Sequence, residues 1–276
     1  FGLSAGDTVT PNELIHAMLT AEVDLLWFGG IGTYIKSRDE NNIEVGDRAN
    51  DSLRINGGHI RAKVVGEGAN LGATQLGRVE YSKSGGRINT DFIDNSAGVC
   101  CSDHEVNIKI LLGMATRSGK LTYAQRNKVL ADMTQDVSDL VLMDNYRQSM
   151  ALTNAEHQSL ALADEHLRFM HALERTGDLD REVEFLPSDE DLETRLSAGA
   201  GLTRPELSVL LAYAKIALFD GVLESSLPDD PYLENTLGLY FPKLIQKRFS
   251  NLVGKHRLRR EIIATYVANT VVNRTG

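Results

Sequence analysis

Two short runs decide the fold of this chain: Gly66-Glu67-Gly68-Ala69-Asn70 and Asp94-Asn95-Ser96-Ala97-Gly98-Val99-Cys100-Cys101-Ser102. Each follows an apolar, strand-like stretch, residues 62–65 before the first run and residues 88–93 before the second. In an open α/β sheet, ligands bind beyond the carboxyl ends of the strands, and a glycine there lets the backbone approach a ligand closely. Two such turns in one segment predict a nucleotide-type cleft.

The residues around these runs predict a parallel sheet. Residues 23–28 form a continuous apolar run that ends at Gly29-Gly30, which is typical of a strand covered on both faces. Residues 73–84 fit either a short helix or the first arm of a hairpin. We favour the helix, because strand, helix and strand is the spacing of a parallel unit. The expected strands lie near residues 23–28, 62–66 and 87–92.

The remainder of the sequence predicts helices almost throughout. An apolar helix follows the second run and is expected to end at Gly119. Asn12 is a candidate cap for an early helix, and Thr203 with Glu206 predicts a capping box for a late one. The longer helical segments are expected at residues 123–146, 153–176 and 233–272.

These patterns predict an α/β fold: the second half of a Rossmann-like doubly wound parallel sheet, followed by an all-helical subdomain. The expected domains are a partial dinucleotide-binding domain, residues 1–118, and a helical C-terminal subdomain, residues 119–276. The chain opens at Phe1 without an initiator methionine and closes directly after an apolar helical pattern. We therefore expect a piece of a longer polypeptide.

Composition narrows the functional classes. The net charge is −9, and no basic stripe with interleaved aromatic residues is present, so nucleic acid is not an expected partner. No apolar run reaches transmembrane length, which predicts no membrane association. The two cysteines, Cys100 and Cys101, are adjacent and fit a reducing cytosol. Histidine and cysteine spacing predicts no metal site. We expect a cytoplasmic protein.

Several residues in the two runs admit both a structural and a functional interpretation. Asn70 can cap the next helix, or its amide can bind a ribose or a carboxamide. Asn95 and Ser102 have no obvious structural role, and Ser102 is expected about two turns into a helix that is capped near Asp94 or Asn95. His104 is expected to be solvated or ion-paired, and the cysteines are expected to be small packing residues. The run Gly30-Ile31-Gly32 lacks the third glycine of a dinucleotide fingerprint and is interpreted as a turn.

At these residues the chain resembles the large bacterial NAD-dependent class of glutamate dehydrogenases. Glu67-Gly68-Ala69-Asn70 matches the Glu-Gly-Ala-Asn turn of the family, and Asn95-Ser96-Ala97-Gly98-Val99 matches its Asn-Ala-Gly-Gly-Val turn with two small-for-small changes. Ser102 falls on a serine of the family. Longer similar stretches are residues 23–36, 47–51, 85–110 and 202–217.

The resemblance implies roles for individual residues and a reaction. Asn70 and Asn95 would contact the nicotinamide ribose and carboxamide of NAD, and Gly68 and Ala69 would let the chain pass close to the cofactor. Ser102 would hydrogen-bond the side-chain carboxylate of L-glutamate. The turn at Gly29 and Gly30 would line the nicotinamide side of the cleft. The reaction would be oxidative deamination of L-glutamate to 2-oxoglutarate and ammonia.

The resemblance also implies that the family's glycine-rich turn, catalytic lysine and catalytic aspartate lie upstream of Phe1. No catalytic residue is therefore assigned within the chain, and we expect it to be inactive in isolation. The complete protein is expected to be a homo-oligomer. Two alternatives remain open: another amino-acid dehydrogenase, acting on leucine or phenylalanine, or a non-catalytic helical regulatory module.

Overall fold

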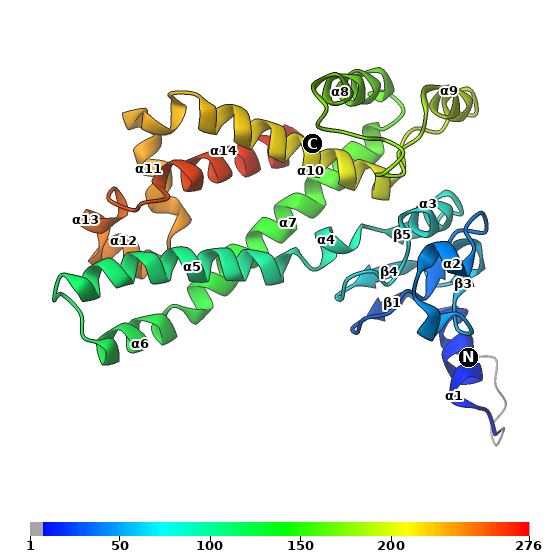
Figure 1. Cartoon of the computed structure of the whole chain (residues 1–276), viewed down its shortest axis with the longest axis horizontal. Coiled ribbons are helices and arrows are strands. Elements are labelled where there is room, and N and C mark those ends of the chain that lie inside the picture. Colours follow the sequence, from blue (N-terminus) through cyan, green and yellow to red (C-terminus); the bar gives the residue numbers. More distant parts are fainter. Residues whose placement is uncertain (1–7, 276) are drawn as a thin grey trace. The chain divides into compact units, whose positions relative to one another are not determined.

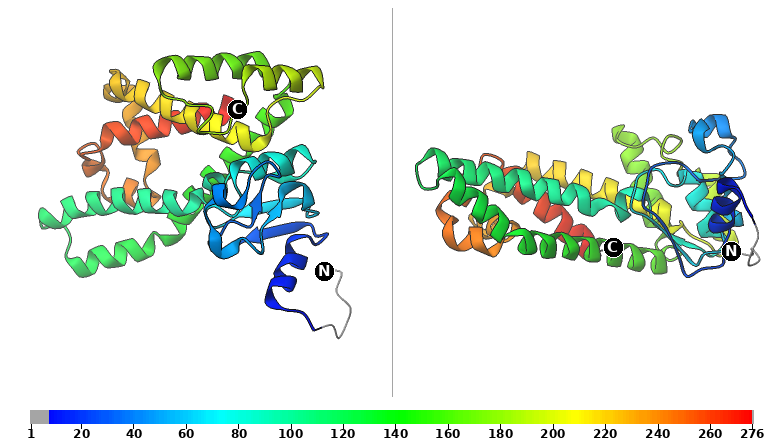
Figure 2. Two further views of the ribbon diagram at one scale, coloured as in Figure 1. Left: turned by 45° about the vertical axis from the view of Figure 1, so that its right-hand side comes forward. Right: turned by 90° about the horizontal axis from the view of Figure 1, so that it is seen from below.

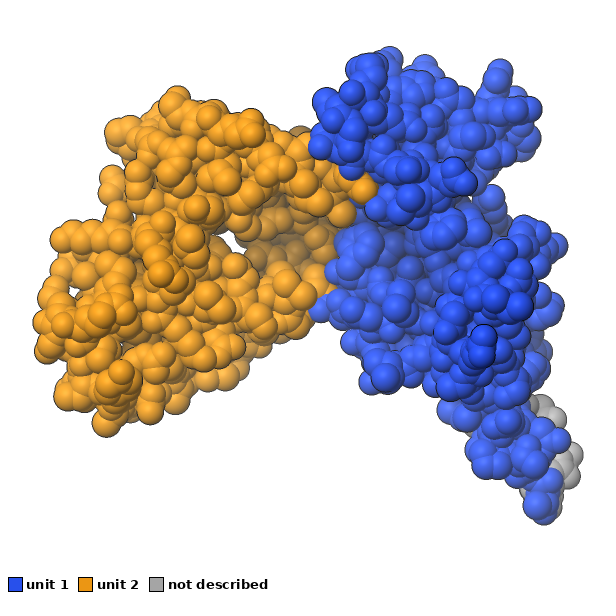
Figure 3. All heavy atoms as spheres, viewed as in Figure 1, with its two compact units in different colours: residues 1–95, 152–210 blue, residues 96–151, 211–276 orange. Residues whose placement is uncertain are grey.

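The computed structural model describes residues 8–275, which form two compact units (Figure 3). Unit 1 comprises the described residues up to Asn95 together with residues 152–210, and unit 2 comprises residues 96–151 and 211 onward. Of the three boundaries, the one after Asn95 falls between two helices, and the other two fall inside the long helices α7 (Thr134–Gln158) and α10 (Arg204–Glu224). Phe1 and Gly276, the ends that predicted a longer polypeptide, lie outside the described residues.

Unit 1 contains a three-stranded parallel sheet in the order β1-β4-β5 (Figure 1). Its strands are β1 (Leu25–Phe28), β4 (Val64–Glu67) and β5 (Arg87–Ile88). Helix α3 (Gln75–Lys83) joins β4 to β5, so the helix predicted at residues 73–84 is confirmed and the hairpin is not formed. The parallel pairing places Trp27 opposite Gly66 and Phe28 opposite Glu67.

The third strand is shorter than the sequence predicts. Residues 87–92 were expected to be extended, but β5 ends at Ile88 and the short helix α4 (Asp91–Asp94) begins two residues later. Helix α4 starts because the amide of Ile93 donates to the carbonyl oxygen of Thr90 at 3.1 Å. Ile93 is therefore buried from a helical turn rather than from a strand, and Phe92 is exposed.

The two faces of the sheet differ because side chains alternate along a strand. Phe28, Val65 and Ile88 point into a core that includes Tyr81 of α3. Trp27 lies on the opposite face and is 56% exposed. One face thus carries the core of unit 1, and the other is open over β1.

The polar region at residues 36–58 holds a second sheet that the sequence did not predict. Strands β2 (Ile35–Lys36) and β3 (Ile55–Asn56) pair in parallel, with α2 (Asn42–Val45) between them. The first helix, α1 (Pro11–Leu19), is capped by Thr10 through a complete capping box with Glu13. The predicted cap Asn12 is wrong, because Pro11 already occupies the first helical position.

Two further helices complete unit 1. Helix α8 (Ala163–Thr176) ends at Gly177, which has a φ of 81°, and α9 (Asp189–Ser197) is capped by the Ser188 side chain, which accepts from the Asp191 amide. The break expected between residues 146 and 153 is wrong, since α7 runs through it. The single helix expected at residues 153–176 is also wrong, because α7 ends at Gln158 and α8 begins at Ala163.

Unit 2 is helical throughout its described residues, and Figure 2 shows α5 and α6 side by side and joined by a short turn. Ile108, Leu111 and Leu112 of α5 pack with Phe241 and Ile245 in one apolar core. The long helices predicted at residues 123–146 and 233–272 are each interrupted. The helices contained wholly in unit 2 are α5 (Ser96–Arg117), α6 (Tyr123–Asp132), α11 (Pro231–Tyr240), α12 (Lys243–Arg248), α13 (Ser250–Val253) and α14 (Arg259–Thr275).

The fold is therefore mixed α/β, with a small parallel sheet and a mostly helical remainder. The units are defined by packing alone, so the division at residue 118 stays a prediction. Within residues 8–275, none of the helices combines the length and apolarity that a membrane crossing requires.

Candidate functional site

The carboxyl ends of β1, β4 and β5 meet at one edge of the sheet, because all three strands are parallel. Asn70 follows β4, and Asn95 follows β5 and α4. The side-chain amide of Asn95 donates to the side-chain carbonyl of Asn70. The structure thus brings together two of the predicted site residues, which are separated in the chain by α3, β5 and α4. Asn70 is exposed and Asn95 is half-buried.

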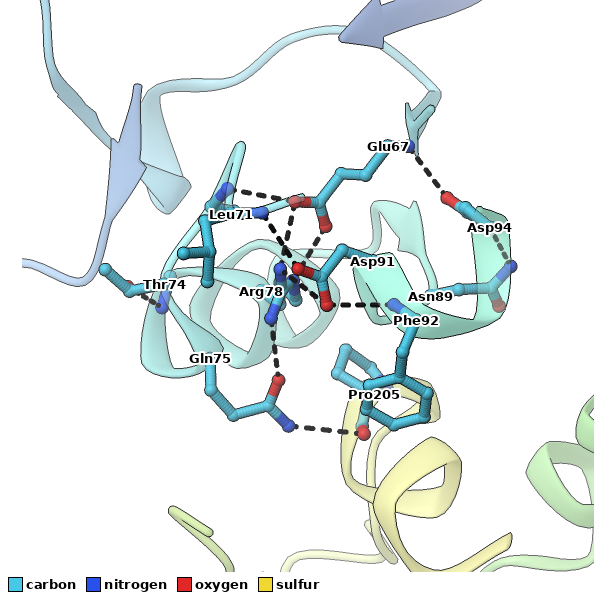
Figure 4. Close-up of polar contacts among 12 residues, drawn as sticks. Glu67, Leu71, Thr74, Gln75, Arg78, Asn89, Asp91, Phe92, Asp94 and Pro205 are labelled. Atoms are coloured by element: carbon cyan, nitrogen blue, oxygen red, sulfur yellow. Dashed lines mark hydrogen bonds and ion pairs between the residues drawn. The ribbon is translucent and has the colours of Figure 1, made fainter. Parts of the chain in front are cut away.

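A buried ion pair fixes the loop that carries Asn70. Glu67 is the last residue of β4, and its side chain is fully buried. Arg78 of α3 donates to both carboxylate oxygens of Glu67, at 2.7 and 2.9 Å, and the amide of Ala73 donates to the same carboxylate at 3.0 Å (Figure 4). Glu67 therefore points away from the edge and anchors the turn between β4 and α3.

Two aspartates of α4 hold this turn from the side of β5. Leu71 has a φ of 60°, which is unusual for a branched residue, and its amide donates to Asp91 at 2.8 Å. The amide of Glu67 donates to Asp94 at 2.8 Å (Figure 4). Both ends of the Gly68–Asn70 turn are thus bonded to the segment that leads to Asn95. The two asparagines are held at fixed positions by these contacts.

Burial and ion pairing act in opposite directions on the charges of this cluster. Burial raises the pKa of Glu67, and the hydrogen bonds and charge of Arg78 oppose that rise. Burial lowers the pKa of Arg78, but its hydrogen bonds to Glu67 and the negative charges of Glu67, Asp91 and Asp94 together outweigh burial and raise it. Burial raises the pKa of Asp94, and hydrogen bonds from Asn89 and from the Glu67 amide oppose that rise. Asp94 was considered as a helix cap, but its carboxylate accepts from Asn89 and Glu67 instead.

Trp27 explains two of the glycines in the first run. A Cβ on Gly66 would lie 2.5 Å from the Trp27 indole, and a Cβ on Gly68 would also lie 2.5 Å from it. A Cβ on Gly30 would meet nothing within 4 Å, and one on Gly29 only the Trp27 indole at 3.9 Å. The close approach at Gly68 is therefore an approach to Trp27. Gly29 and Gly30 are exposed with open space around them.

A cavity of about 420 Å³ lies on the Trp27 face of the sheet, within unit 1. Apolar residues of β1 and β4 form one side, and polar residues from the ends of α7 and α10 form the other. Asn70 and Asn95 do not line it. Its lining residues include Trp27, Val64, Gly66, Asn89, Asp94, Glu156 and Arg204.

Ser102 lies about two turns into α5, as predicted, and is exposed in unit 2. Its hydroxyl donates to the carbonyl oxygen of Gly98 at 3.3 Å. Three residues beside it were predicted to be solvated or to pack. Cys101 is exposed, Cys100 is half-buried, and His104 is 5% exposed. The expectation that His104 is solvated or ion-paired is wrong, because its ring stacks on Tyr240 at 4.5 Å.

A second polar cluster surrounds the buried face of α5 within unit 2. The hydroxyl of Tyr240 donates to Asp103 at 2.5 Å and accepts from the amide of Asn107 at 2.9 Å. Burial lowers the pKa of Lys215 to about 8, and its ammonium group donates to Gln148 at 2.5 Å. Burial also lowers the pKa of His104. This cluster packs against the helix that carries Ser102.

Sequence reasoning missed the residues that position the edge. Arg78, Asp91, Asn89 and Arg204 were not identified as site residues, although each contacts the two runs or their neighbours. The sequence signal that could have identified them was a charged residue within an apolar stretch. An acidic residue at the end of an apolar strand, such as Glu67, requires a cationic partner when it is buried.

Comparisons with known proteins match both the N-terminal and the C-terminal part of the chain to glutamate dehydrogenases. Residues 2–155 match the family described as "Bacterial NAD-glutamate dehydrogenase, catalytic domain", and residues 199–276 match "Glutamate dehydrogenase, C-terminal". The NAD-specific glutamate dehydrogenases of Pseudomonas aeruginosa and Halomonas elongata are 54% and 53% identical over 98% of this chain. That of Mycobacterium tuberculosis is 46% identical over 97% of it. The chain spans only 16–17% of the length of these relatives. The chain belongs to the bacterial NAD-glutamate dehydrogenase family.

Proposed function

We propose that this chain forms the nicotinamide side of the cofactor site in an NAD-dependent glutamate dehydrogenase. The contact between Asn70 and Asn95 at the carboxyl edge of parallel strands carries the proposal. This edge is where ligands bind in open α/β sheets. The three strands would then be the second half of a larger doubly wound sheet.

The chemistry of the two asparagines fits NAD. Each side-chain amide has a donor group and an acceptor group, and their mutual contact uses one donor and one acceptor. The NH₂ group of Asn70 and the carbonyl of Asn95 would serve a ribose hydroxyl or the carboxamide, which itself donates and accepts. The open space at Gly29 and Gly30 would leave room beside the ring. NAD supplies the hydride acceptor when it is bound.

Ser102 would bind the side-chain carboxylate of L-glutamate, because an exposed hydroxyl can donate to a carboxylate oxygen. The products would be 2-oxoglutarate and ammonia. Turnover would need groups that move protons at the amino-acid carbon and nitrogen, and we propose that the rest of the polypeptide supplies them. The complete enzyme would be a cytoplasmic homo-oligomer.

Steady-state kinetics of the complete enzyme tests these roles. Asn95→Ala should raise the KM for NAD by about 10-fold or more, the loss expected for one or two hydrogen bonds to a ligand. Ser102→Ala should raise the KM for glutamate more than the KM for NAD. Asn127→Ala, an exposed asparagine on α6, is the matched control and should change neither.

The outcome separates this function from its alternatives. Unchanged kinetics in both Asn95→Ala and Ser102→Ala would contradict the assignment of the site. A substrate panel distinguishes glutamate from leucine and phenylalanine, which need an apolar pocket for their side chains. An intact protein that binds no NAD by calorimetry would favour a non-catalytic helical module.

A further inference from the structure

Arg204 joins three separate segments of unit 1. It is the first residue of α10, and its side chain is only 13% exposed. Its Nε donates to the side-chain carbonyl of Asn89 at 2.6 Å. Its Nη1 donates to Thr153 at 3.2 Å and to Glu156 at 3.1 Å. One guanidinium thus connects the end of β5 with the last turns of α7.

The contact with Asn89 continues to the edge of the sheet. The amide of Asn89 donates to Asp94 at 2.6 Å, and the other oxygen of Asp94 accepts from the backbone amide of Glu67. Three hydrogen bonds therefore lead from Arg204 to the last residue of β4. Asp94 immediately precedes Asn95, and Glu67 begins the turn that ends at Asn70. Arg204 acts on both asparagines through these neighbours.

The start of α10 is itself held firmly. Glu206 is fully buried, accepts from the backbone amide and hydroxyl of Thr203 at 2.7 and 2.6 Å, and pairs with Arg195 at 2.7 Å. The side-chain amide of Gln75 in α3 donates to the carbonyl oxygen of Pro205 at 3.2 Å. A guanidinium projecting from this anchored turn can hold Asn89 in place because its own backbone is constrained from both sides.

We propose that Arg204 is a positioning residue for the nicotinamide edge, so that the segment matching the C-terminal family supports cofactor binding through Asn89 and Asp94. The inference rests on the proposed function, and it deepens it. The planar guanidinium bonds in two directions at once, through Nε to Asn89 and through Nη1 to Thr153 and Glu156. A lysine ammonium is a single point on a flexible stem and cannot reproduce that fork.

The electrostatics of Asp94 supports the same role. Burial raises the pKa of Asp94, and the positive charge of Arg204 is among the influences that oppose this rise. An ionised carboxylate accepts from both Asn89 and the Glu67 amide, whereas a protonated one presents fewer acceptor sites. Arg204 therefore supports the charge state that keeps the two loops joined.

The experiment compares Arg204→Met and Arg204→Lys in the complete enzyme. Arg204→Met should raise the KM for NAD about 5- to 20-fold while the KM for glutamate changes less than about twofold, because only the nicotinamide edge relaxes. Arg204→Lys should fall between Arg204→Met and the unmodified enzyme. Direct calorimetric titration with NAD should show the same fold-loss in affinity.

Arg181→Met is the matched control. Arg181 is 15% exposed and also bridges two acidic residues, Glu174 and Asp189, but it lies between α8 and α9. Its loss should leave both KM values unchanged, even where the amount of active enzyme falls. A purely structural role of Arg204 would give the same result as this control and would overturn the inference.

Two more variants keep the result decisive. Asn89→Leu breaks the path to Asp94 but keeps the guanidinium and its contacts with Thr153 and Glu156, and it should reproduce the NAD-specific effect even where Arg204→Met fails to fold. Combined with Asn95→Ala, Arg204→Met should add less than its separate effect. An NAD effect in Asn95→Ala alone overturns this inference and leaves the proposed function intact. No NAD effect in Asn95→Ala overturns the proposed function itself.

Discussion

The polar cluster at the sheet edge of unit 1 and the polar cluster around α5 in unit 2 bury their groups in opposite ways. In unit 1, buried Glu67 has three donors, and two of them belong to Arg78. In unit 2, buried His104 and Asn107 each leave one side-chain atom without a partner among the residues that the structure describes. The first cluster pairs its buried carboxylate with an arginine, whereas burial in the second lowers the pKa values of His104 and Lys215.

The difference shows what each cluster does. Ion pairs with short hydrogen bonds have strict geometry, so they hold the loops of Asn70 and Asn95 in position. Hydrogen bonds between neutral groups tolerate more variation in distance and angle. The helices of unit 2 are therefore positioned by apolar side chains such as Leu111 and Phe241. We therefore expect mutations in the unit 1 cluster to lower stability by leaving a buried charge without its partner. In the unit 2 cluster we expect mutations to change how stability depends on pH.

The largest effect is expected for Arg78→Met. Removing the guanidinium leaves the Glu67 carboxylate buried without its ionic partner, which costs about 3–5 kcal/mol of unfolding free energy. Urea unfolding of the 276-residue chain at neutral pH measures this loss. Adding Glu67→Gln to Arg78→Met should recover part of it, because the glutamine is neutral and still accepts from Ala73.

Arg38→Met is the control for that comparison. Arg38 pairs with Glu80 at 3.5 Å, but its side chain is 68% exposed. Its loss should cost less than about 1 kcal/mol, as is usual for surface ion pairs. Equal losses for the two arginine variants would show that the burial of Glu67 and Arg78 does not matter to stability.

An intermediate effect is expected for Lys215 and depends on pH. Burial lowers the pKa of Lys215 to about 8 in the folded chain, against about 10.4 for an unfolded lysine. Between these values the unfolded chain binds more protons, so this group adds stability as the pH rises. Lys215→Met should therefore be more stable than the unmodified chain at pH 7, and its advantage should shrink by roughly 2 kcal/mol by pH 10.

Urea unfolding of both chains between pH 7 and 10 measures this difference. Cys100 has a pKa raised by burial, so it contributes the opposite slope in the same range. Subtracting the two chains removes most of that contribution, because both retain the cysteine. An advantage of Lys215→Met that stays constant with pH would contradict the burial of the lysine.

The smallest effect is expected for the glycines of the edge. Gly68→Ala places a Cβ 2.5 Å from the Trp27 indole and should cost about 1 kcal/mol, since the half-exposed indole can shift. Gly30→Ala meets open space and should change stability by less than about 0.5 kcal/mol. Thermal unfolding compares the two, and Trp27→Leu should remove most of the Gly68→Ala cost. A Gly68→Ala cost that persists without the indole would contradict this explanation of the glycine.

The sequence by itself determined the positions of β1, β4 and β5, the helix between β4 and β5 and the edge where Asn70 and Asn95 meet, but it did not predict β2 and β3. Those features follow from local patterns: apolar runs of strand length, turns of small residues and the alternation of strand and helix. The same local logic failed where a turn replaced a strand after Ile88 and where α7 ran through an expected break. Local patterns do not specify lengths that are limited by packing.

Only the tertiary structure decided which residues hold the edge. Arg204 and Asn89 are separated by 115 residues in the chain, and Arg78 reaches back 11 residues to Glu67. A buried charge requires a partner, but the sequence offers 29 lysines and arginines for any one carboxylate. The folded chain selects among them, because hydrogen bonds form only between groups that packing has already brought within about 3 Å.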